Sequence, residues 1–586
     1  MELRENTAAI HDAQTGKWLF FDHPVACFDV RETGDVVPAL KEIERRIRQD
    51  GLMAAGFLAY EAAPAFDSAL KTRHPEGFPL LWFGLYRERR EITLPDAAQP
   101  VRLDWRPSTG EEAYRRAIAR IKEYIQAGDT YQTNYTLRLH ALFSEDPLDF
   151  FARIIGAQHC AYGALFNTGE WTVCCASPEL FFSLDGRELV SRPMKGTIAR
   201  GLWYEQDRAN AERLRESEKD RAENVMIVDM VRNDMGRIAV TGSVEVVSLF
   251  DIEQYPTLWQ MTSTVRCATD AGIAEIFGAL FPPASITGAP KTRTMEIIAE
   301  LEDRPRRIYC GTAGMITGPR KAQFNVAIRT VLIDKQTGAA EYGAGGGIVW
   351  DSTADSEFGE CATKARVLTY APPDFALLET IRWTPEDGFF LLDRHLRRLR
   401  QSAEYFAFTM DVETIRRSLS LSAAKLPARP HRIRLAVSRD GKPSIEAFPL
   451  ILPPHYRVCI AQEPVDRQNP LLYHKTTCRD VYDHARRRHP GFDDVLLWND
   501  RGEITESCIA NVVVEMEGKR FTPPVECGLL PGTYRAMLLE QGLVTERKIG
   551  LADLARCSGV FLINSVREEW RVSIEGSPNS LNAEIR

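Results

Sequence analysis

Apolar residues with helical spacing and apolar residues with strand spacing follow one another along the 586-residue chain, and this pattern predicts a mixed α/β (α+β) fold. Helix-like stretches cover residues 113–125, 220–230 and 292–301, and strand-like stretches cover residues 179–184 and 238–247. The pattern contains no low-complexity segment and no long internal repeat.

The clearest boundary is marked by the dipeptide Pro372-Pro373, which follows a helix-like run. A proline cannot continue a helix, and it pushes the residue before it into an extended conformation. A strand-like run over residues 375–382 comes next. The sequence therefore predicts one domain over residues 1–372 and a second over residues 373–586.

The second part begins with strands, contains a helix-like stretch near residues 394–406 and returns to β-rich sequence over residues 495–514.

Composition agrees with a soluble enzyme of several domains, because 44% of the residues are apolar and 26% are charged. The net charge of -8 argues against nucleic acid as a partner. We expect a cytoplasmic protein without a membrane span, since no long apolar run occurs and the N-terminus has no signal-peptide pattern. The twelve cysteines contain no CxxC pair and are expected to be reduced thiols.

Three glutamates in the first part are candidates for binding a divalent cation. Glu223 opens a run with charged ends, and Glu357 and Glu360 share one face if their segment is helical. Carboxylates from two separate helices commonly hold Mg²⁺, which prefers oxygen ligands. Two solvated helix faces would produce the same spacing, so the pattern alone leaves both interpretations open.

Other residues of the first part are suited to an anionic substrate. The glycine run 343–347 would let backbone N–H groups approach an oxyanion, and a helix that begins after Pro290 would point its positive end at a nearby carboxylate. Arg329 is a candidate carboxylate clamp. A turn and a surface ion pair are the ordinary alternatives. The Walker spacing is absent, so no ATP site is predicted.

Four of these segments, taken together and in this order, resemble the chorismate-utilising family, which includes anthranilate synthase component I and aminodeoxychorismate synthase component I. The segments are Ser285–Lys291, Met295–Ile298, Tyr309–Gly311 and Gly345–Val349. The resemblance covers a catalytic core of about residues 110–368, whereas the first hundred residues match only through residues 56–61.

Lys195 distinguishes the branches of that family. Anthranilate synthases carry alanine at this place and aminodeoxychorismate synthases carry lysine. The resemblance implies nucleophilic catalysis in which the Lys195 amine adds at C2 of chorismate and expels the C4 hydroxyl. Ammonia then adds at C4 and expels the lysine. Two displacements place nitrogen at C4 with retained configuration.

The resemblance also implies roles for other residues of the first part. Glu179 aligns with the general acid/base that assists departure of the hydroxyl, Glu223 and Glu360 align with Mg²⁺ ligands, and Glu357 lies close to them. The residues implied to contact the substrate are Thr287, Tyr309, Arg329, Gly345, Gly196 and Thr197. Gln260 stands where many relatives have histidine, and because glutamine cannot titrate, the acid role is assigned to Glu179.

The second part contains the groups that a pyridoxal phosphate enzyme needs. These are a lysine for covalent attachment, a carboxylate against the pyridine nitrogen and donors for the phosphate. Lys475, Glu506, and Arg398 with Thr533 provide them in order, although each alone is typical of a solvated surface. In this order and spacing they resemble the class IV aminotransferase family of fold type IV. That family includes amino-acid aminotransferases and 4-amino-4-deoxychorismate lyase.

The match to the class IV family runs over most of residues 375–565, in a part that is short for the family. Asn564-Ser565-Val566-Arg567 resembles a lyase-like signature. The resemblance implies that pyruvate is eliminated from 4-amino-4-deoxychorismate to give 4-aminobenzoate, and that the second part forms a homodimer.

We therefore expect a bifunctional enzyme that aminates chorismate at C4 and then forms 4-aminobenzoate for folate synthesis, with Mg²⁺ and pyridoxal 5'-phosphate as cofactors. No glutamine amidotransferase pattern occurs in the sequence, so ammonia is expected from solution or from a separate amidotransferase subunit. Two alternatives remain open. One is an anthranilate synthase component I-like enzyme fused to an amino-acid aminotransferase, and the other is a non-catalytic subunit that recruits an amidotransferase.

Overall fold

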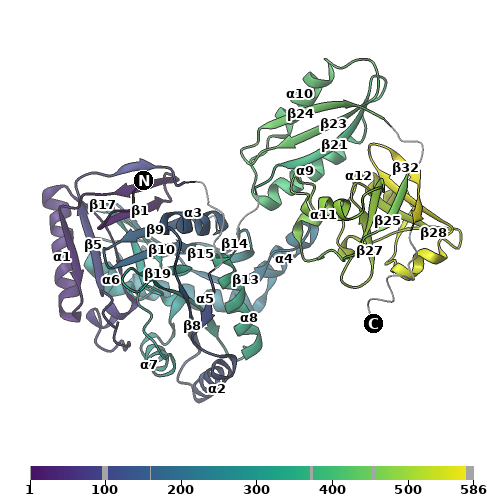
Figure 1. Ribbon diagram of the computed structural model, residues 1–586. Coiled ribbons are helices and arrows are strands. Elements are labelled where there is room, and N and C mark those ends of the chain that lie inside the picture. Colours follow the sequence, from purple (N-terminus) through teal and green to yellow (C-terminus); the bar gives the residue numbers. More distant parts are fainter. Residues whose placement is uncertain (1, 96–102, 159, 370–373, 452–455, 576–586) are drawn as a thin grey trace. The chain divides into compact units, whose positions relative to one another are not determined.

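The computed structural model describes residues 2–95, 103–158, 160–369, 374–451 and 456–575 (Figure 1). The chain divides into two compact units. The first comprises Met1–Arg200 and Ala211–Pro372, and the second comprises Gly201–Asn210 and Pro373–Arg586. The ten residues Gly201–Asn210 thus belong to the second unit, although they lie in the middle of the first unit's sequence. The residues 370–373 that carry the proline boundary lie outside the described residues.

The first unit is built on two antiparallel sheets. One runs in the order β16-β8-β20-β19-β10-β9-β1-β2-β6, with β7 on β8. Its strands are β1 (Thr7–Asp12), β2 (Lys17–Phe21), β6 (Arg90–Ile92), β7 (Arg106–Pro107), β8 (Gln132–Leu142), β9 (Tyr162–Asn167), β10 (Trp171–Ser177), β16 (Gly288–Ala289), β19 (Thr330–Asp334) and β20 (Ala339–Ile348).

The second sheet of this unit runs in the order β13-β15-β12-β11-β18-β17-β4-β5-β3, with β14 on β15. Its strands are β3 (Ala26–Val30), β4 (Met53–Leu58), β5 (Leu81–Tyr86), β11 (Leu180–Asp185), β12 (Glu188–Arg192), β13 (Met194–Ala199), β14 (Glu245–Gln254), β15 (Leu258–Ala268), β17 (Thr312–Gly318) and β18 (Lys321–Val326). Strands from the first hundred residues occur in both sheets, so that region is integral to the fold.

The two sheets pack face to face, because one core cluster takes side chains from both of them, such as Phe166 and Phe57. Helices cover the outer faces, where α1, α5 and α6 pack on one sheet and α2, α3 and α8 on the other. The helices of this unit are α1 (Thr33–Asp50), α2 (Glu111–Ala127), α3 (Pro147–Gln158), α5 (Glu218–Gly236), α6 (Ile273–Leu280), α7 (Lys291–Leu301) and α8 (Ala354–Ala365). Helix α4 (Tyr204–Glu216) begins in the second unit and ends in the first.

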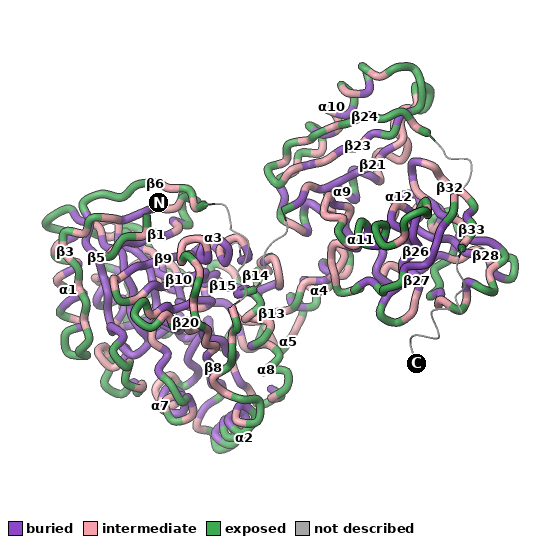
Figure 2. The backbone as a smooth tube through the Cα atoms, in the orientation of Figure 1, coloured by how far each residue is buried: buried purple, intermediate pink, exposed green. Residues whose placement is uncertain are grey.

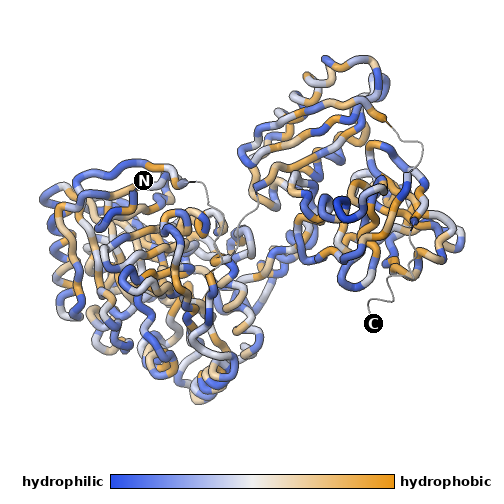
Figure 3. The backbone as a smooth tube through the Cα atoms, viewed as in Figure 1, coloured by the Kyte–Doolittle hydropathy of each residue, from blue (hydrophilic) through white to orange (hydrophobic). Residues whose placement is uncertain are grey.

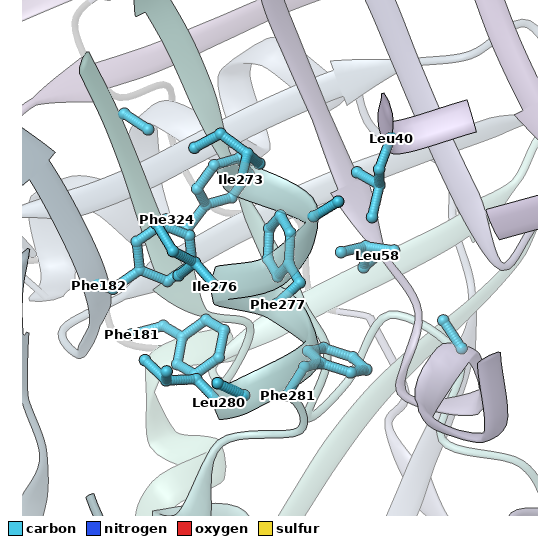
Figure 4. Close-up of a cluster of buried hydrophobic side chains, with 14 of the residues drawn as sticks. Leu40, Leu58, Phe181, Phe182, Ile273, Ile276, Phe277, Leu280, Phe281 and Phe324 are labelled. Atoms are coloured by element: carbon cyan, nitrogen blue, oxygen red, sulfur yellow. The ribbon is translucent and has the colours of Figure 1, made fainter. Parts of the chain in front are cut away.

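Helix α6 illustrates how periodicity forms this core. Ile273, Ile276, Phe277 and Leu280 point inward from one side of α6 onto Phe182 and Phe324 of β11 and β18 (Figure 4). The Phe277 ring lies 5.3 Å from the Phe182 ring and 5.0 Å from the Phe324 ring. Figure 2 shows the resulting distribution of burial: the strands are largely buried, and surface helices such as α1 expose one side.

Arg306 and Glu302 form a buried ion pair in the segment between α7 and β17. Arg306, 1% exposed, donates to Glu302 and to the backbone carbonyls of Ile286 and Asn134. The Glu61 carboxylate accepts the backbone N–H of Arg306 at 2.7 Å. Residues 56–61, which carried the weak family match, therefore brace the segment that leads to Tyr309.

The second unit contains a small four-stranded sheet, β22-β21-β23-β24, packed against α9 and α10. These elements are β21 (Leu377–Thr384), β22 (Gly388–Phe389), β23 (His431–Val437), β24 (Pro443–Pro449), α9 (Leu392–Phe406) and α10 (Val412–Ala423).

A larger mixed sheet completes the second unit and runs β30-β29-β28-β27-β26-β25-β33, with β31 on β28 and β32 on β31. Its elements, with the two neighbouring helices, are β25 (Arg457–Ile460), α11 (Asp480–Arg488), β26 (Asp494–Trp498), β27 (Ile504–Ser507), β28 (Asn511–Met516), β29 (Lys519–Thr522), α12 (Thr533–Glu540), β30 (Thr545–Glu546), β31 (Gly559–Asn564), β32 (Glu568–Arg571) and β33 (Ser573–Glu575). Figure 3 shows the apolar strands of this sheet beside the polar helix α11.

Most predicted elements occur in the structure. One prediction needs correction. Residues 238–244 contain turns and an isolated bridge at Ala239, and the strand β14 begins only at Glu245. The glycine run 343–347, for which a turn was the ordinary alternative, is the interior of strand β20 and pairs with β8 along its whole length. Glycine suits these positions because side chains of neighbouring elements fill the space above the strand.

All twelve cysteines are free thiols, and no helix within the described ranges is long and apolar enough to cross a membrane.

Candidate active sites

The first unit contains a cavity of about 360 Å³. Strand β13, the glycine segment of β20 and the helices α5 and α8 form its walls. Among the predicted site residues it is lined by Glu179, Lys195, Gly196, Thr197, Glu223, Gln260, Tyr309, Arg329, Gly345, Glu357 and Glu360. The structure therefore brings together residues that are up to 181 positions apart, from Glu179 to Glu360.

Lys195 projects from β13 across the glycine segment of β20. Its Nζ lies 3.9 Å from Glu223 Oε2. A Cβ atom added to Gly347 would stand only 2.3 Å from Lys195 Nζ and 2.9 Å from Gln132 Nε2. Glycine is thus required at position 347, because any side chain would displace the lysine. Gln132 was not recognised from the sequence; its amide is fully buried and neither Nε2 nor Oε1 has a hydrogen-bond partner among the described residues.

Glu179 lies at the start of β11, 3% exposed. Its Oε1 accepts a hydrogen bond from Ser285 Oγ at 2.6 Å and from the Met194 backbone N–H at 3.4 Å. Burial raises the pKa of Glu179 to about 7, and the bond from Ser285 limits that rise. A carboxyl group with this pKa exchanges a proton near neutral pH, which suits a general acid/base.

The three carboxylates proposed for a divalent cation come from α5 and α8. A Cβ on Gly346 would lie 2.9 Å from Glu357 Oε2 and 3.9 Å from Glu360 Oε1, so both reach over the same strand. Lys364 balances part of the negative charge of these carboxylates, because its Nζ is 2.7 Å from Glu360 Oε1. Burial raises the pKa of Glu223, whereas Lys364 lowers the pKa of Glu360. Lys364, one turn after Glu360, was missed although its spacing on a helix signals such a pair.

Arg329 provides the clearest sign that an anion binds in this cavity. Its guanidinium is 8% exposed, and its Nη1 is buried without a hydrogen-bond partner among the described residues. Burial lowers the pKa of Arg329, as expected for a desolvated cation without a counter-ion. An unpaired buried charge costs several kcal/mol of free energy, on the order of 3–5. A substrate carboxylate would remove that cost.

Tyr309 and Gly345 also line the cavity, and Thr287 does not. The Tyr309 ring covers Gly343, where an added Cβ would come within 2.3 Å of it. Thr287 is 0% exposed, and its hydroxyl donates to the backbone carbonyls of Pro283 and Ala284 at 3.3 and 3.2 Å. The Thr287 side chain is thus not among the residues that line the cavity, and a contact between Thr287 and the substrate stays a prediction.

The second unit contains a larger cavity of about 560 Å³, and all four predicted cofactor residues line it: Lys475, Glu506, Arg398 and Thr533. Burial, together with the nearby guanidinium groups of Arg398 and Arg479, lowers the pKa of Lys475 to about 8. A lysine with this pKa is a better amine nucleophile at neutral pH than an exposed one.

Glu506 lies on β27 opposite the lysine's segment, 4% exposed. Its carboxylate accepts hydrogen bonds from Tyr482 Oη at 2.8 Å and Asn511 Nδ2 at 3.1 Å. Burial raises the pKa of Glu506 to about 7. A protonated ring nitrogen placed against this carboxylate would favour its ionised form.

Arg398 is held by Glu379 on β21. Arg398 Nε and Nη2 donate to the two Glu379 oxygens at 2.9 and 2.7 Å, and His395 contacts the same carboxylate at 2.6 Å. Burial raises the pKa of Glu379, but Arg398 and His395 outweigh it and hold that pKa at about 2. Glu379 and His395 were not recognised from the sequence. Glu379 holds the guanidinium of Arg398, and His395 contacts the hydroxyl of Thr533, the first residue of α12.

The residues present fit both expected cofactors. The first cavity offers carboxylate oxygens from two helices, the donor chemistry of Mg²⁺. Within the described residues these side chains do not converge into a ligand cluster of three or more, because Ser352, Lys195 and Lys364 hold them individually. The second cavity offers a lysine, a buried carboxylate and the Arg398–Thr533 pair at a helix N-terminus, as pyridoxal phosphate requires.

Each of the two compact units contains a cavity lined by one of the two predicted lysines, Lys195 in the first and Lys475 in the second. The chain belongs to the chorismate binding enzymes, whose family model matches residues 6–370. A second family model, amino-transferase class IV, matches residues 376–574. The family match includes the N-terminal hundred residues, in agreement with their strands in both sheets.

Individual relatives cover the first unit. Aminodeoxychorismate synthase component 1 of Escherichia coli (strain K12) is 38% identical over 263 residues, which are 44% of this chain and 58% of that protein. The same-named protein of Bacillus subtilis (strain 168) is 38% identical over 257 residues, 44% of this chain and 54% of that protein. The chain thus spans somewhat more than half the length of these relatives. Anthranilate synthase component I from Streptococcus pneumoniae TIGR4 shares the fold, with a TM-score of 0.53 at 23% identity over 63% of this chain and 94% of that one.

Proposed function

We propose that the chain converts chorismate to 4-aminobenzoate in two reactions, one in each cavity. The first is amination of chorismate at C4 to 4-amino-4-deoxychorismate, and the second is elimination of pyruvate from that product. The observation that carries the proposal is the position of Lys195, which reaches into a cavity with a neutral-range carboxyl group, Glu179, and an unpaired guanidinium, Arg329.

In the first reaction the Lys195 amine attacks C2 of chorismate, both ring double bonds shift, and the C4 hydroxyl leaves with a proton from Glu179. Ammonia then attacks C4, both double bonds shift back, and the C2–N bond to Lys195 breaks. The net change is chorismate plus ammonia giving 4-amino-4-deoxychorismate plus water. Glu179 is close enough to the lysine's strand for this role, since it accepts a bond from the backbone of Met194.

Substrate orientation follows from the charges that line the cavity. We assign one substrate carboxylate to Arg329, whose buried guanidinium has a donor to spare. The second carboxylate would be shared with Mg²⁺ held by Glu223 and Glu360, with Glu357 next to them. The ion supplies charge neutralisation for the departing and attacking groups. Tyr309, packed on the glycine strand, lines the same cavity.

In the second reaction pyridoxal phosphate would supply an electron sink when bound. Lys475 would hold the cofactor and, once released, would take the proton from the amine-bearing ring carbon and deliver a proton to the methylene of the enolpyruvyl group. Pyruvate leaves and the ring becomes aromatic. Glu506 would hold the ring nitrogen protonated, and Arg398 with Thr533 would bind the phosphate. This reaction needs no second amino donor.

The proposed partner of the first unit is a glutamine amidotransferase that supplies ammonia. The relatives from E. coli and B. subtilis bear the designation component 1. We therefore expect the purified chain to use ammonium directly and to use glutamine only after a separate amidotransferase is added. We also propose that the second part forms a homodimer, on the resemblance to fold type IV.

The test is incubation of the purified chain with chorismate, ammonium, Mg²⁺ and pyridoxal phosphate, followed by identification of the product by mass and absorbance. We expect 4-aminobenzoate and pyruvate in equal amounts. Anthranilate as the product would assign the first site to the other family branch. No turnover of chorismate under any of these conditions would favour the recruiting-subunit alternative.

The second site is tested separately by borohydride reduction and peptide mapping. We expect a pyridoxyl group on Lys475 and nowhere else. The variant Lys475→Ala should accumulate 4-amino-4-deoxychorismate while conversion of chorismate continues. A pyridoxyl group on a different lysine would contradict the assignment of the whole second cavity.

A further inference from the structure

Lys195 sits in a β-bulge. Strand β13 pairs with β15 so that Met194 faces Thr262 and Thr197 faces Gln260. Three steps along β13 therefore match two steps along β15, and the extra residue lies at Lys195–Gly196. Gly196 has φ of 94°, a left-handed conformation that favours glycine. Bulges of this kind re-aim a side chain and leave backbone groups without ladder partners.

Two buried side-chain amides satisfy the backbone of this bulge. Gln260 Nε2 donates to the Gly196 carbonyl at 2.7 Å, and Gln260 Oε1 accepts from Thr197 Oγ1 at 3.0 Å. Asn224 Nδ2, on α5, donates to the Lys195 carbonyl at 3.4 Å. Asn224 is itself held by Ser263 Oγ, which donates to Asn224 Oδ1 at 2.5 Å.

The two amides act from opposite elements on consecutive carbonyls, those of Lys195 and Gly196. Gln260 is 8% exposed and Asn224 is 1% exposed, so solvent does not compete for these bonds. An amide can donate and accept at once without carrying charge. It can therefore fix the bulge without placing a further carboxylate or cation beside the reacting amine.

We propose that Gln260, together with Asn224, is a positioning residue that locks the bulge and so aims the Lys195 amine at the substrate. The inference rests on the proposed function of Lys195 as the nucleophile. Gln260 transfers no proton in this role. It acts on the reaction only through the backbone on either side of the Gly196 peptide group.

The test uses the full chain and the first half of the reaction. Wild type, Gln260→Leu and the control Thr262→Val are each mixed with chorismate and Mg²⁺ without ammonium, quenched at intervals and analysed for a covalent adduct on Lys195. Thr262 is matched because it lies on the same strand and its hydroxyl makes a comparable bond, to Glu253 Oε1 at 2.8 Å. Chorismate affinity is measured on the same samples.

We expect Gln260→Leu to slow adduct formation by about 100-fold, the effect of a misplacement on the order of 1 Å, with chorismate affinity unchanged. Thr262→Val should behave as wild type. Gln260→Glu, which keeps the acceptor for Thr197 and loses the donor to Gly196, should fall between them. If Gln260→Leu fails to fold, Gln260→Met, of similar length to the native side chain, takes its place.

Three results would overturn the inference. Adduct formation at the wild-type rate in Gln260→Leu would show that the hydrogen bonds of Gln260 are not needed to position Lys195. Weakened chorismate affinity with an unchanged rate would make Gln260 a substrate contact. A changed pH dependence of adduct formation in Gln260→Leu would make it part of proton transfer. If wild type converts chorismate without forming an adduct on Lys195, the proposed two-displacement reaction is wrong. The positioning role of Gln260, which rests on that reaction, is then wrong as well.

Discussion

At the scale of single residues, the chemistry of both sites depends on how burial changes charged side chains. Burial raises the pKa values of Glu179 and Glu506 to about 7 and lowers that of Lys475 to about 8. Groups that are fully charged in water thereby become able to exchange protons near neutral pH. Arg329 is a buried cation whose Nη1 has no hydrogen-bond partner among the described residues, so it could provide binding energy for an anion.

Replacing Lys195 by alanine should abolish amination at C4 and leave the fold intact, because the side chain lines the cavity and its amine lies 3.9 Å from Glu223 Oε2. The measurement is product identity by mass together with the circular dichroism spectrum. Lys321→Ala, an exposed lysine on β18, is the control and should retain full activity. Normal formation of 4-amino-4-deoxychorismate by Lys195→Ala would contradict the covalent mechanism.

The pH dependence of the first reaction should report Glu179. A general acid must be protonated, and the pKa of about 7 means that its protonated fraction falls as pH rises through 7. We expect kcat with chorismate to be highest below that value and to decline tenfold per pH unit well above it. In Glu179→Gln the activity should be very low at every pH. An unchanged decline in that variant would assign the titration to another group.

At the scale of elements, each site is assembled at the meeting point of strands and helices that are distant in sequence. Strand β13 brings the lysine, α5 and α8 bring the carboxylates, and β20 supplies a floor without side chains. The positions of α5 and α6 depend in turn on the aromatic cluster beneath them. A weakened cluster should therefore loosen the site before the unit unfolds.

Phe277→Ala should destabilise the first unit by about 3–5 kcal/mol, the cost of removing a buried aromatic ring from a packed core. Phe277 has an exposed fraction of 0% and touches the rings of Phe182 and Phe324 (Figure 4). The measurement is urea unfolding followed by a signal specific to the first unit, such as loss of chorismate turnover. Val25→Ala, a partly exposed residue of the same unit, should shift the midpoint little.

At the scale of the whole molecule, the boundary between units does not coincide with a single point in the sequence. Gly201–Asn210 leaves the first unit six residues after Lys195 and joins the second. There the Trp203 ring stacks on Tyr473 at 5.4 Å, and Tyr405 Oη donates to the Gly201 carbonyl at 2.8 Å. Tyr473 lies two residues before Lys475, so this segment braces the lysine of the second site.

Trp203→Ala should therefore affect the second reaction more than the first. We expect a loss of roughly 2 kcal/mol in stability of the second unit, less than for a fully buried tryptophan because Trp203 is half-buried. The measurements are retention of pyridoxal phosphate after dialysis and accumulation of 4-amino-4-deoxychorismate. Trp350→Ala, an exposed tryptophan of the first unit, is the control. Equal losses in both reactions would contradict the assignment of this segment to the second unit.

The sequence by itself determined the mixed fold class and several helices, and it supplied the candidate residues of both sites. Local periodicity reveals α2, α5, α7 and α9, because their apolar faces repeat along a continuous stretch. Motif order identified Lys195, Glu179, Arg329 and the family to which the first unit belongs. These features depend on neighbouring residues or on residue order, and both can be read along a chain.

Only the tertiary structure decided which atoms meet. Thr287 was predicted to contact the substrate; in the structure its hydroxyl bonds to the backbone three and four residues before it, and its side chain is not among those that line the cavity. Glu379 and the amides of Gln260 and Asn224 bond to partners on other elements, and Gln132 lies beside Gly347 of β20, so no local pattern could reveal these contacts. The transfer of Gly201–Asn210 to the second unit was equally invisible, because packing between distant segments depends on shape and burial, which exist only once the chain has folded.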